Sequence, residues 1–166
     1  MHACWPAGAP VERTTAAYDY RGEVAAAIST AKLAGAWAAW PALTTALLDR
    51  LREDPPEVDV VTWVTTRPRR IRERGADHAE HIARELARGL ALPVRCLLRA
   101  AGRTGSGDGY LAVHDLPGTE VLLVDDILTT GATAWRAAAE LHRVGAGRIH
   151  LAVLARAGSH PLGPGR

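Results

Sequence analysis

The chain predicts an α/β domain with three layers: a parallel sheet of about five strands between flanking helices. Short, nearly continuous apolar runs rich in Val, Ile and Leu alternate with longer segments of helical periodicity. Such runs are typical of strands that are covered on both faces. The length of 166 residues suits one domain with a single sheet at its centre.

Five segments carry the strand pattern. Residues 58–64, "VDVVTWV", are β-branched and almost wholly apolar, and residues 120–126, "EVLLVDD", give the clearest strand of the chain. The other segments are residues 92–98, 148–155 and a short piece at 110–113.

Helices are predicted between these strands. Residues 18–35 begin as a short extended piece and continue into a helix that ends near Gly35. A second helix covers residues 37–52, before Pro55 and Pro56. Apolar positions recur at helical spacing over residues 72–92, and a last helix over residues 131–144 ends at Gly145.

The remaining segments suggest how the domain is bounded. Residues 1–17 lack periodicity and are predicted to form a loose lead-in, residues 18–156 form the domain, and residues 157–166 form a frayed tail. Residues 100–109, "AAGRTGSGDG", are rich in glycine and are expected to form a mobile loop.

Composition excludes several classes of protein. The net charge of +2 is too small to indicate nucleic-acid binding by itself. Cys4 and Cys96 lie far apart, so no zinc is expected. No apolar run reaches membrane-spanning length and no signal peptide is evident, so a cytoplasmic location is expected. His78 and His81, one helical turn apart, could bind a metal, but no third ligand has helpful spacing.

The stretch "VLLVDDILTTGAT", residues 121–133, carries the chemistry. In a parallel sheet, ligands bind beyond the carboxyl ends of the strands, and Asp125 and Asp126 stand at such an end. The small residues that follow lead into a helix whose first amides can receive an anion. Acids that bind a diol beside a phosphate loop fit a ribose 5-phosphate. The alternative is a solvated turn in which Thr130 only caps the helix.

This stretch resembles the phosphoribosyl pyrophosphate (PRPP) motif of type I phosphoribosyltransferases, a family with a Rossmann-like fold and a small N-terminal hood. The resemblance implies that Asp125 and Asp126 bind the ribose and serve catalysis. It implies 5-phosphate binding by Thr129, Thr130, Gly131, Ala132 and Thr133.

The segment "TTRPRRIRERG" after the first apolar strand adds basic residues. The resemblance implies that Thr65, Thr66 and Arg67 bind pyrophosphate. Arginine is suited to bidentate phosphate contacts. Further phosphate contacts are expected among Arg70, Arg74 and Lys32, although a solvated basic face explains most of these arginines equally well.

The chain is most similar to the ComF-like, competence-associated branch of the family. "ERGADHAEHIAREL" and the Tyr…Gly…Ile…Lys…Gly pattern of "YDYRGEVAAAISTAKLAG" carry this resemblance, with Lys32 in the lysine position. The cysteine-rich zinc ribbon of ComF-like proteins is absent from the N-terminus. The flexible loop of the family is short here and keeps only Arg103 and Thr104.

The resemblance implies an Mg²⁺-dependent transfer of phosphoribosyl from PRPP to a nitrogen base, with release of pyrophosphate. The acceptor base cannot be read from the sequence. A homodimer is compatible with the family. The alternative is a protein of the competence or DNA-uptake type with reduced catalysis, which senses PRPP or a nucleotide. Nucleic acid is a further candidate partner under this alternative.

Overall fold

The computed structural model describes residues 5, 8–33, 40–67, 71–72, 75–104 and 107–158. Among the helices in these ranges, none combines the length and the apolar character needed to cross a bilayer.

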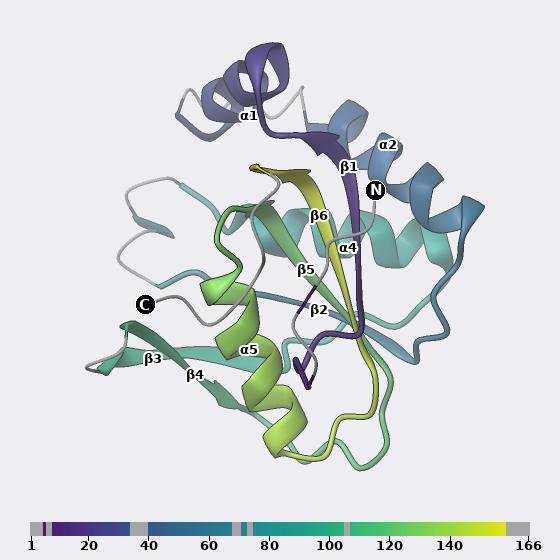
Figure 1. Cartoon of the computed structure of the whole chain (residues 1–166), viewed down its shortest axis with the longest axis vertical. Helices are drawn as coiled ribbons and strands as arrows, with labels where there is room; N and C mark the ends of the chain where they lie inside the picture. Colours follow the sequence, from purple (N-terminus) through teal and green to yellow (C-terminus); the bar gives the residue numbers. More distant parts are fainter. Residues whose placement is uncertain are drawn as a thin grey trace.

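A parallel sheet of four strands forms the centre of the molecule (Figure 1). Its order is β1 (Arg13–Asp19), β6 (Ile149–Arg156), β5 (Val121–Leu128) and β2 (Val60–Trp63). β5 is an inner strand, with Val121 paired to Val60 on one side and to Ile149 on the other. The carboxyl ends of β5, β6 and β2 therefore lie at one edge of the sheet.

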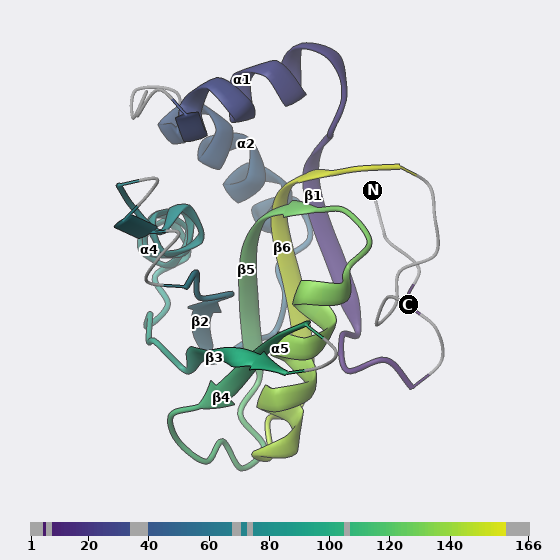
Figure 2. The ribbon, with the colours of Figure 1, turned by 90° about the vertical axis from the view of Figure 1, so that its left-hand side faces the viewer.

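Helices cover both faces of this sheet (Figure 2). α2 (Trp40–Glu53) and α4 (His78–Leu90) lie on one face, and α5 (Ala132–Arg143) lies on the other. α1 (Gly22–Leu33) follows β1 and lies beyond the carboxyl ends of the strands. The expected α/β fold with a parallel sheet between helices is thus confirmed.

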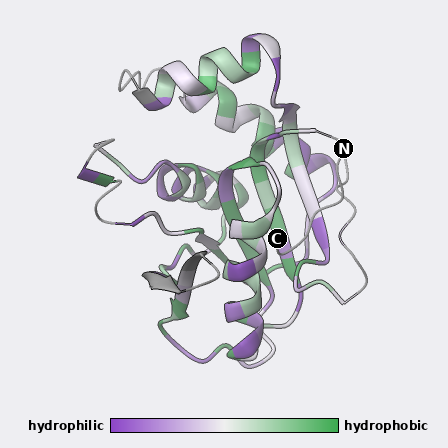
Figure 3. Cartoon of the chain, turned by 60° about the vertical axis from the view of Figure 1, so that its left-hand side comes forward, coloured by the Kyte–Doolittle hydropathy of each residue, from purple (hydrophilic) through white to green (hydrophobic). Residues whose placement is uncertain are grey.

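The pleat of β5 divides the core into two clusters. Val121 and Leu123 face α5, whereas Leu122 and Val124 face the side of α2 and α4, and all four are fully buried. Figure 3 shows the same concentration of hydrophobic residues along the central strands. The uninterrupted apolar run in the sequence is explained by this burial on both faces.

The lead-in predicted for residues 1–17 was wrong for residues 13–17, which belong to β1. This strand pairs with β6, where Arg13 stands opposite His150 and Ala16 opposite Val153. Its sequence, "RTTAAYD", has little apolar bulk. Pairing with a strand more than 130 positions away therefore makes the strand, and a local pattern does not reveal such pairing.

The loop expected at residues 100–109 was wrong in its secondary structure, because the described residues there belong to strands, whereas its mobility stays a prediction. β3 (Leu98–Thr104) and β4 (Gly107–Ala112) form a separate antiparallel ribbon. The strands predicted at 92–98 and 110–113 consequently do not join the main sheet as full strands. Only Val94 forms an isolated parallel bridge to Val61. Glycines lower strand propensity, which hid this ribbon in the sequence.

The last residue of β4 connects the ribbon to α5 through a hydrogen bond. The backbone N–H of Ala112 donates a hydrogen bond of 2.8 Å to Oε1 of Glu140. The ribbon therefore stands beside the face of the sheet that α5 covers.

Candidate functional site

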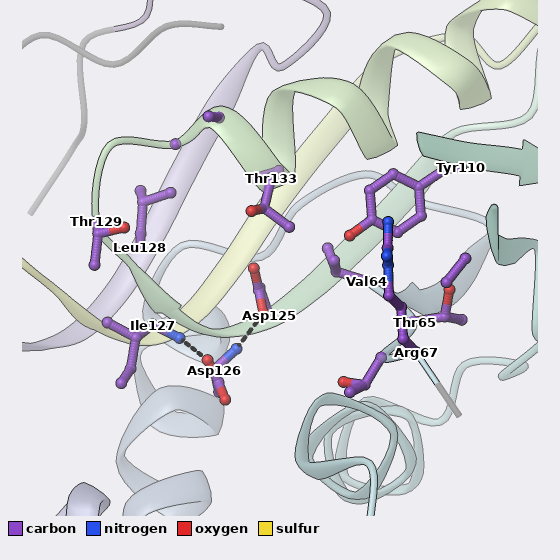
Figure 4. A pocket seen from close by; sticks show the side chains of 15 residues that line it. Val64, Thr65, Arg67, Tyr110, Asp125, Asp126, Ile127, Leu128, Thr129 and Thr133 are labelled. Carbon is purple, nitrogen blue, oxygen red and sulfur yellow. Dashed lines mark hydrogen bonds between the residues drawn. The ribbon is translucent and has the colours of Figure 1, made fainter. Parts of the chain in front are cut away.

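Asp125 and Asp126 stand side by side near the carboxyl end of β5. The N–H of Asp126 donates to Oδ1 of Asp125 at 2.8 Å, and the N–H of Ile127 donates to Oδ1 of Asp126 at 2.6 Å. Consecutive side chains of a strand point to opposite faces. Asp125 accordingly points toward Thr133 at the start of α5, and Asp126 points the other way (Figure 4).

The two acids have different electrostatic surroundings. Burial raises the pKa of Asp125 well above its usual range, and the neighbouring charge of Asp126 raises it further. Asp126 forms an ion pair with Lys32 of α1, with 2.6 Å between Nζ and Oδ2. Buried carboxylates with raised pKa values and charged partners are common at functional sites.

The segment after β5 turns into α5 at Gly131. Gly131 has φ +80° and ψ −3°, a left-handed conformation that glycine adopts without a steric penalty. Its carbonyl accepts the first hydrogen bond of the helix, from the N–H of Trp135 at 2.8 Å. The preceding N–H groups lie before the helical hydrogen-bond ladder and are directed outward from the helix end, where an anion can bind.

A second loop, residues 65–67, follows β2 and faces the first loop across the sheet edge. Asp77 holds this loop, because its carboxylate accepts hydrogen bonds from the N–H of Thr66 at 2.8 Å and from Thr66 Oγ1 at 3.2 Å. Burial raises the pKa of Asp77 from its ordinary value, while the bonds from Thr66 oppose that rise. Asp77 precedes α4 without capping that helix, so its side chain serves the loop.

The two loops enclose a cavity of about 170 Å³. It is open to solvent and smaller than the roughly 300–1,000 Å³ typical of pockets for drug-sized ligands. Its lining comes from β2 and the following loop, the ribbon, β5 and the start of α5. These residues are Val64, Thr65, Thr66, Arg67, Ala100, Tyr110, Asp125, Asp126, Ile127, Leu128, Thr129, Gly131, Ala132, Thr133 and Ala134.

Most of the site residues predicted from the sequence lie around this one cavity. Thr130 does not line it, and its hydroxyl instead accepts a hydrogen bond of 3.4 Å from the N–H of Ala132. Lys32 contacts Asp126 and lies outside the lining. Arg103 and Thr104 lie on β3. Arg70 and Arg74 are outside the described residues.

Sequence reasoning missed the contribution of the ribbon. Ala100 on β3 pairs with Tyr110 on β4, and both line the cavity. The ring of Tyr110 lies beside Arg67 (Figure 4). Tyr110 is 9% exposed and is the aromatic wall of the site. The tyrosine stands directly after "GDG". Tyr110 could have been predicted as a site residue only if residues 98–112 had been predicted as a β-hairpin.

The described residues contain no group of three or more His, Cys, Asp or Glu side chains arranged to hold a metal ion. His78, predicted as one half of a histidine pair, is buried and stacks on Trp40, with 4.8 Å between the ring centroids.

Comparison with protein families identifies the chain. The model of the phosphoribosyl transferase domain matches residues 71–164, which is more than half of the sequence. The chain belongs to this family. The matched range holds β5, the loop to α5 and the ribbon, whereas β1, α1 and the loop after β2 precede it. No curated protein matches the chain by sequence.

Solved structures agree with the family assignment. A purine phosphoribosyltransferase from Pyrococcus horikoshii shares 25% identity at a TM-score of 0.54, over 77% of this chain and 80% of that one. An orotate phosphoribosyltransferase from Aeropyrum pernix also shares 25% identity, at a TM-score of 0.52, over 76% of this chain and 66% of that one. The chain is thus similar to solved phosphoribosyltransferases, as the sequence motif predicts.

Proposed function

We propose that this phosphoribosyltransferase binds PRPP as its Mg²⁺ complex and transfers the phosphoribosyl group to a nitrogen base. One observation carries the proposal: the acids of β5, the start of α5 and the loop after β2 open onto a single cavity. Those three elements supply, in order, acceptors for hydroxyls, donors for a phosphate and donors for a second anion.

Each part of PRPP has a matching group in the cavity. The carboxylate of Asp125 can accept hydrogen bonds from the ribose hydroxyls. Thr129, Gly131 and the N–H groups of residues 131–133 can surround the 5-phosphate, since a helix N-terminus favours an anion. Thr65, Thr66 and Arg67 can bind the pyrophosphate, for which a planar guanidinium offers paired donors.

The residues present fit a magnesium ion that arrives with its substrate. Mg²⁺ is usually held by one or two carboxylates together with substrate phosphates and water, and the carboxylate of Asp125 would meet that requirement. When bound, Mg²⁺ offsets negative charge on the pyrophosphate. The absence of a larger ligand cluster among the described residues is compatible with this role.

In the proposed reaction the ring nitrogen of the base forms a bond to C1 of the ribose, and a proton carried by that nitrogen is released to solvent. The bond between C1 and the pyrophosphate oxygen breaks, and its electron pair leaves on pyrophosphate. Positive charge grows on the ribose in the transition state, and the nearby carboxylate of Asp125 stabilises it. The partly buried position of Asp125 strengthens this electrostatic effect.

The ComF-like type is the subfamily that we propose. It is supported by Arg74-Gly75 and the helix at Ala79-Glu80 in "ERGADHAEHIAREL", and by Lys32 at the lysine position. An assay with a panel of bases would identify the acceptor, whether purine, orotate or another base.

Isothermal titration of Mg²⁺·PRPP into the wild type and the Asp125→Asn/Asp126→Asn variant tests the site. We expect wild-type binding that the double variant weakens by at least about 100-fold, since each lost charge-assisted contact contributes roughly 1.5–3 kcal/mol. Asp59→Asn is the matched control, because Asp59 lies at the amino end of β2 and accepts a bond from the N–H of Glu120. Equal affinity in wild type and double variant would refute the site.

Release of pyrophosphate from PRPP, followed with each base of a panel, tests the reaction itself. Release with one base class establishes the transferase. Binding of PRPP without release by any base would instead support the sensing role, and it would contradict the proposed transfer.

A further inference from the structure

We infer that Lys32 is a positioning residue, which holds Asp126 on the α1 side of β5 and thereby leaves Asp125 as the acid that faces the ligand. The inference rests on the proposed PRPP site and adds to it a division between the two acids. It also makes α1, outside the matched family region, a part of the site's construction.

The contacts of Asp126 carry the inference. Its Oδ2 lies 2.6 Å from Nζ of Lys32, and its Oδ1 accepts the N–H of Ile127 at 2.6 Å. Both oxygens are therefore engaged within the protein. The two side chains are only 16% and 19% exposed, so the pair is shielded from water.

The strand pleat gives the same division. Residues 121 and 123 of β5 face α5, and Asp125 continues that row toward Thr133. Residues 122 and 124 face the opposite cluster, which also contains Ile28 and Ala31 of α1. Asp126 continues this second row and meets Lys32 there.

Helix α1 fixes where the lysine can reach. Ile28 and Ala31 are almost fully buried, so the helix cannot rotate without losing core contacts. Lys32 follows them in the last turn, where a cation is favoured by the helix dipole. A buried core contact thus sets the position of the ammonium group.

The ion pair between Lys32 and Asp126 also affects the electrostatics of the two acids. Two neighbouring carboxylates repel each other when both are charged and partly buried. The charge of Lys32 offsets this repulsion. It also acts to lower the pKa of Asp125, against the rise caused by burial and by Asp126. An isolated charge left in such a position carries a large penalty, so removal of the lysine would leave the carboxylate of Asp126 without its ion-pair partner.

A double-mutant cycle in Mg²⁺·PRPP binding tests whether Lys32 acts through Asp126. We expect Lys32→Met to raise the Kd about tenfold, equivalent to about 1.4 kcal/mol. In the Asp126→Asn background the same substitution should change the Kd by less than about twofold, because its partner charge is already gone. Lys32→Arg, which keeps the charge, should recover part of the loss.

Independent losses that multiply in the double variant would overturn the inference and indicate that Lys32 touches PRPP directly. An unchanged Kd in Lys32→Met would overturn it as well. Arg21→Met is the control for charge removal near α1, since the Arg21 side chain is 81% exposed. Circular dichroism of every variant checks that the fold is retained.

A second readout does not depend on PRPP. Lys32 is the only lysine of the chain, so reductive methylation with ¹³C-formaldehyde labels this amine and the α-amino group alone. We expect the Lys32 resonance to shift between wild type and Asp126→Asn without ligand. An identical resonance would refute the ion pair, whereas failure of wild type to bind Mg²⁺·PRPP would refute the proposed function and leave the pair in place.

Discussion

Replacement of Gly131 by alanine separates the backbone requirement of the phosphate loop from its role in binding. Gly131 adopts φ +80° where the chain enters α5. A residue with a Cβ atom pays about 1–2 kcal/mol in this left-handed conformation. Since a domain of this size loses about 2–4 °C of Tm for each kcal/mol, we expect Gly131→Ala to lower the Tm by about 2–8 °C.

The same substitution should weaken PRPP binding more than it weakens the fold. To relieve the strain, the loop must rotate the N–H groups that precede the helical ladder away from the cavity. Loss of one hydrogen bond to a charged group costs roughly 1.5–3 kcal/mol, so the Kd should rise by more than about tenfold. Urea unfolding followed by tryptophan fluorescence and calorimetric titration of Mg²⁺·PRPP measure the two effects.

Gly118→Ala is the matched control. Gly118 also has a left-handed backbone, with φ +67°, and no heavy atom lies within 4 Å of where a Cβ would stand. It precedes β5 at the end opposite the cavity. We expect the same loss of stability with unchanged affinity. Equal affinities in the two alanine variants would refute the assignment of residues 129–133 to the phosphate, and an unchanged Tm in both would refute the strain argument.

Two further predictions concern the other acids. Burial and the charge of Asp126 raise the pKa of Asp125, so its ionised form costs stability at neutral pH and this cost disappears as pH falls to the ordinary aspartate range. Asp125→Asn should therefore unfold at higher urea than wild type at pH 7, with the difference shrinking toward about pH 4, and a gap that stays constant with pH would contradict this sign. Asp77→Ala should weaken pyrophosphate binding in calorimetry while leaving ribose 5-phosphate affinity unchanged, because the N–H and hydroxyl of Thr66 lose their acceptor. Equal weakening of both ligands would show that Asp77 supports the whole fold and not the one loop.

Local patterns of the sequence predicted the elements whose burial is continuous. β2, β5 and β6 have apolar runs that are covered on both faces, and α4 has apolar positions at helical spacing along one side. β1 was not predicted, because this strand forms through pairing with β6 and not through a local apolar pattern. The ribbon was not predicted, because glycines stand where β-branched residues usually indicate a strand.

The same distinction applies to the site. The motif around Asp125 and the loop at residues 65–67 could be placed at one edge, since parallel strands end together. The partner of Lys32 could not be found, because it lies 94 positions away and on another layer of the fold. Likewise the bond from Thr66 to Asp77 depends on how the loop folds back on the start of α4.

Because of the pleat of β5, the two neighbouring aspartates have different surroundings. Both acids line the cavity, but the side chain of the first points toward Thr133, whereas the side chain of the second is paired with a lysine. An engineer who wishes to alter which sugar the protein accepts has one position to vary, whereas the adjoining position is tied to the packing of the first helix. The doublet therefore cannot be exchanged as a unit between proteins unless the lysine and its helix are transferred with it.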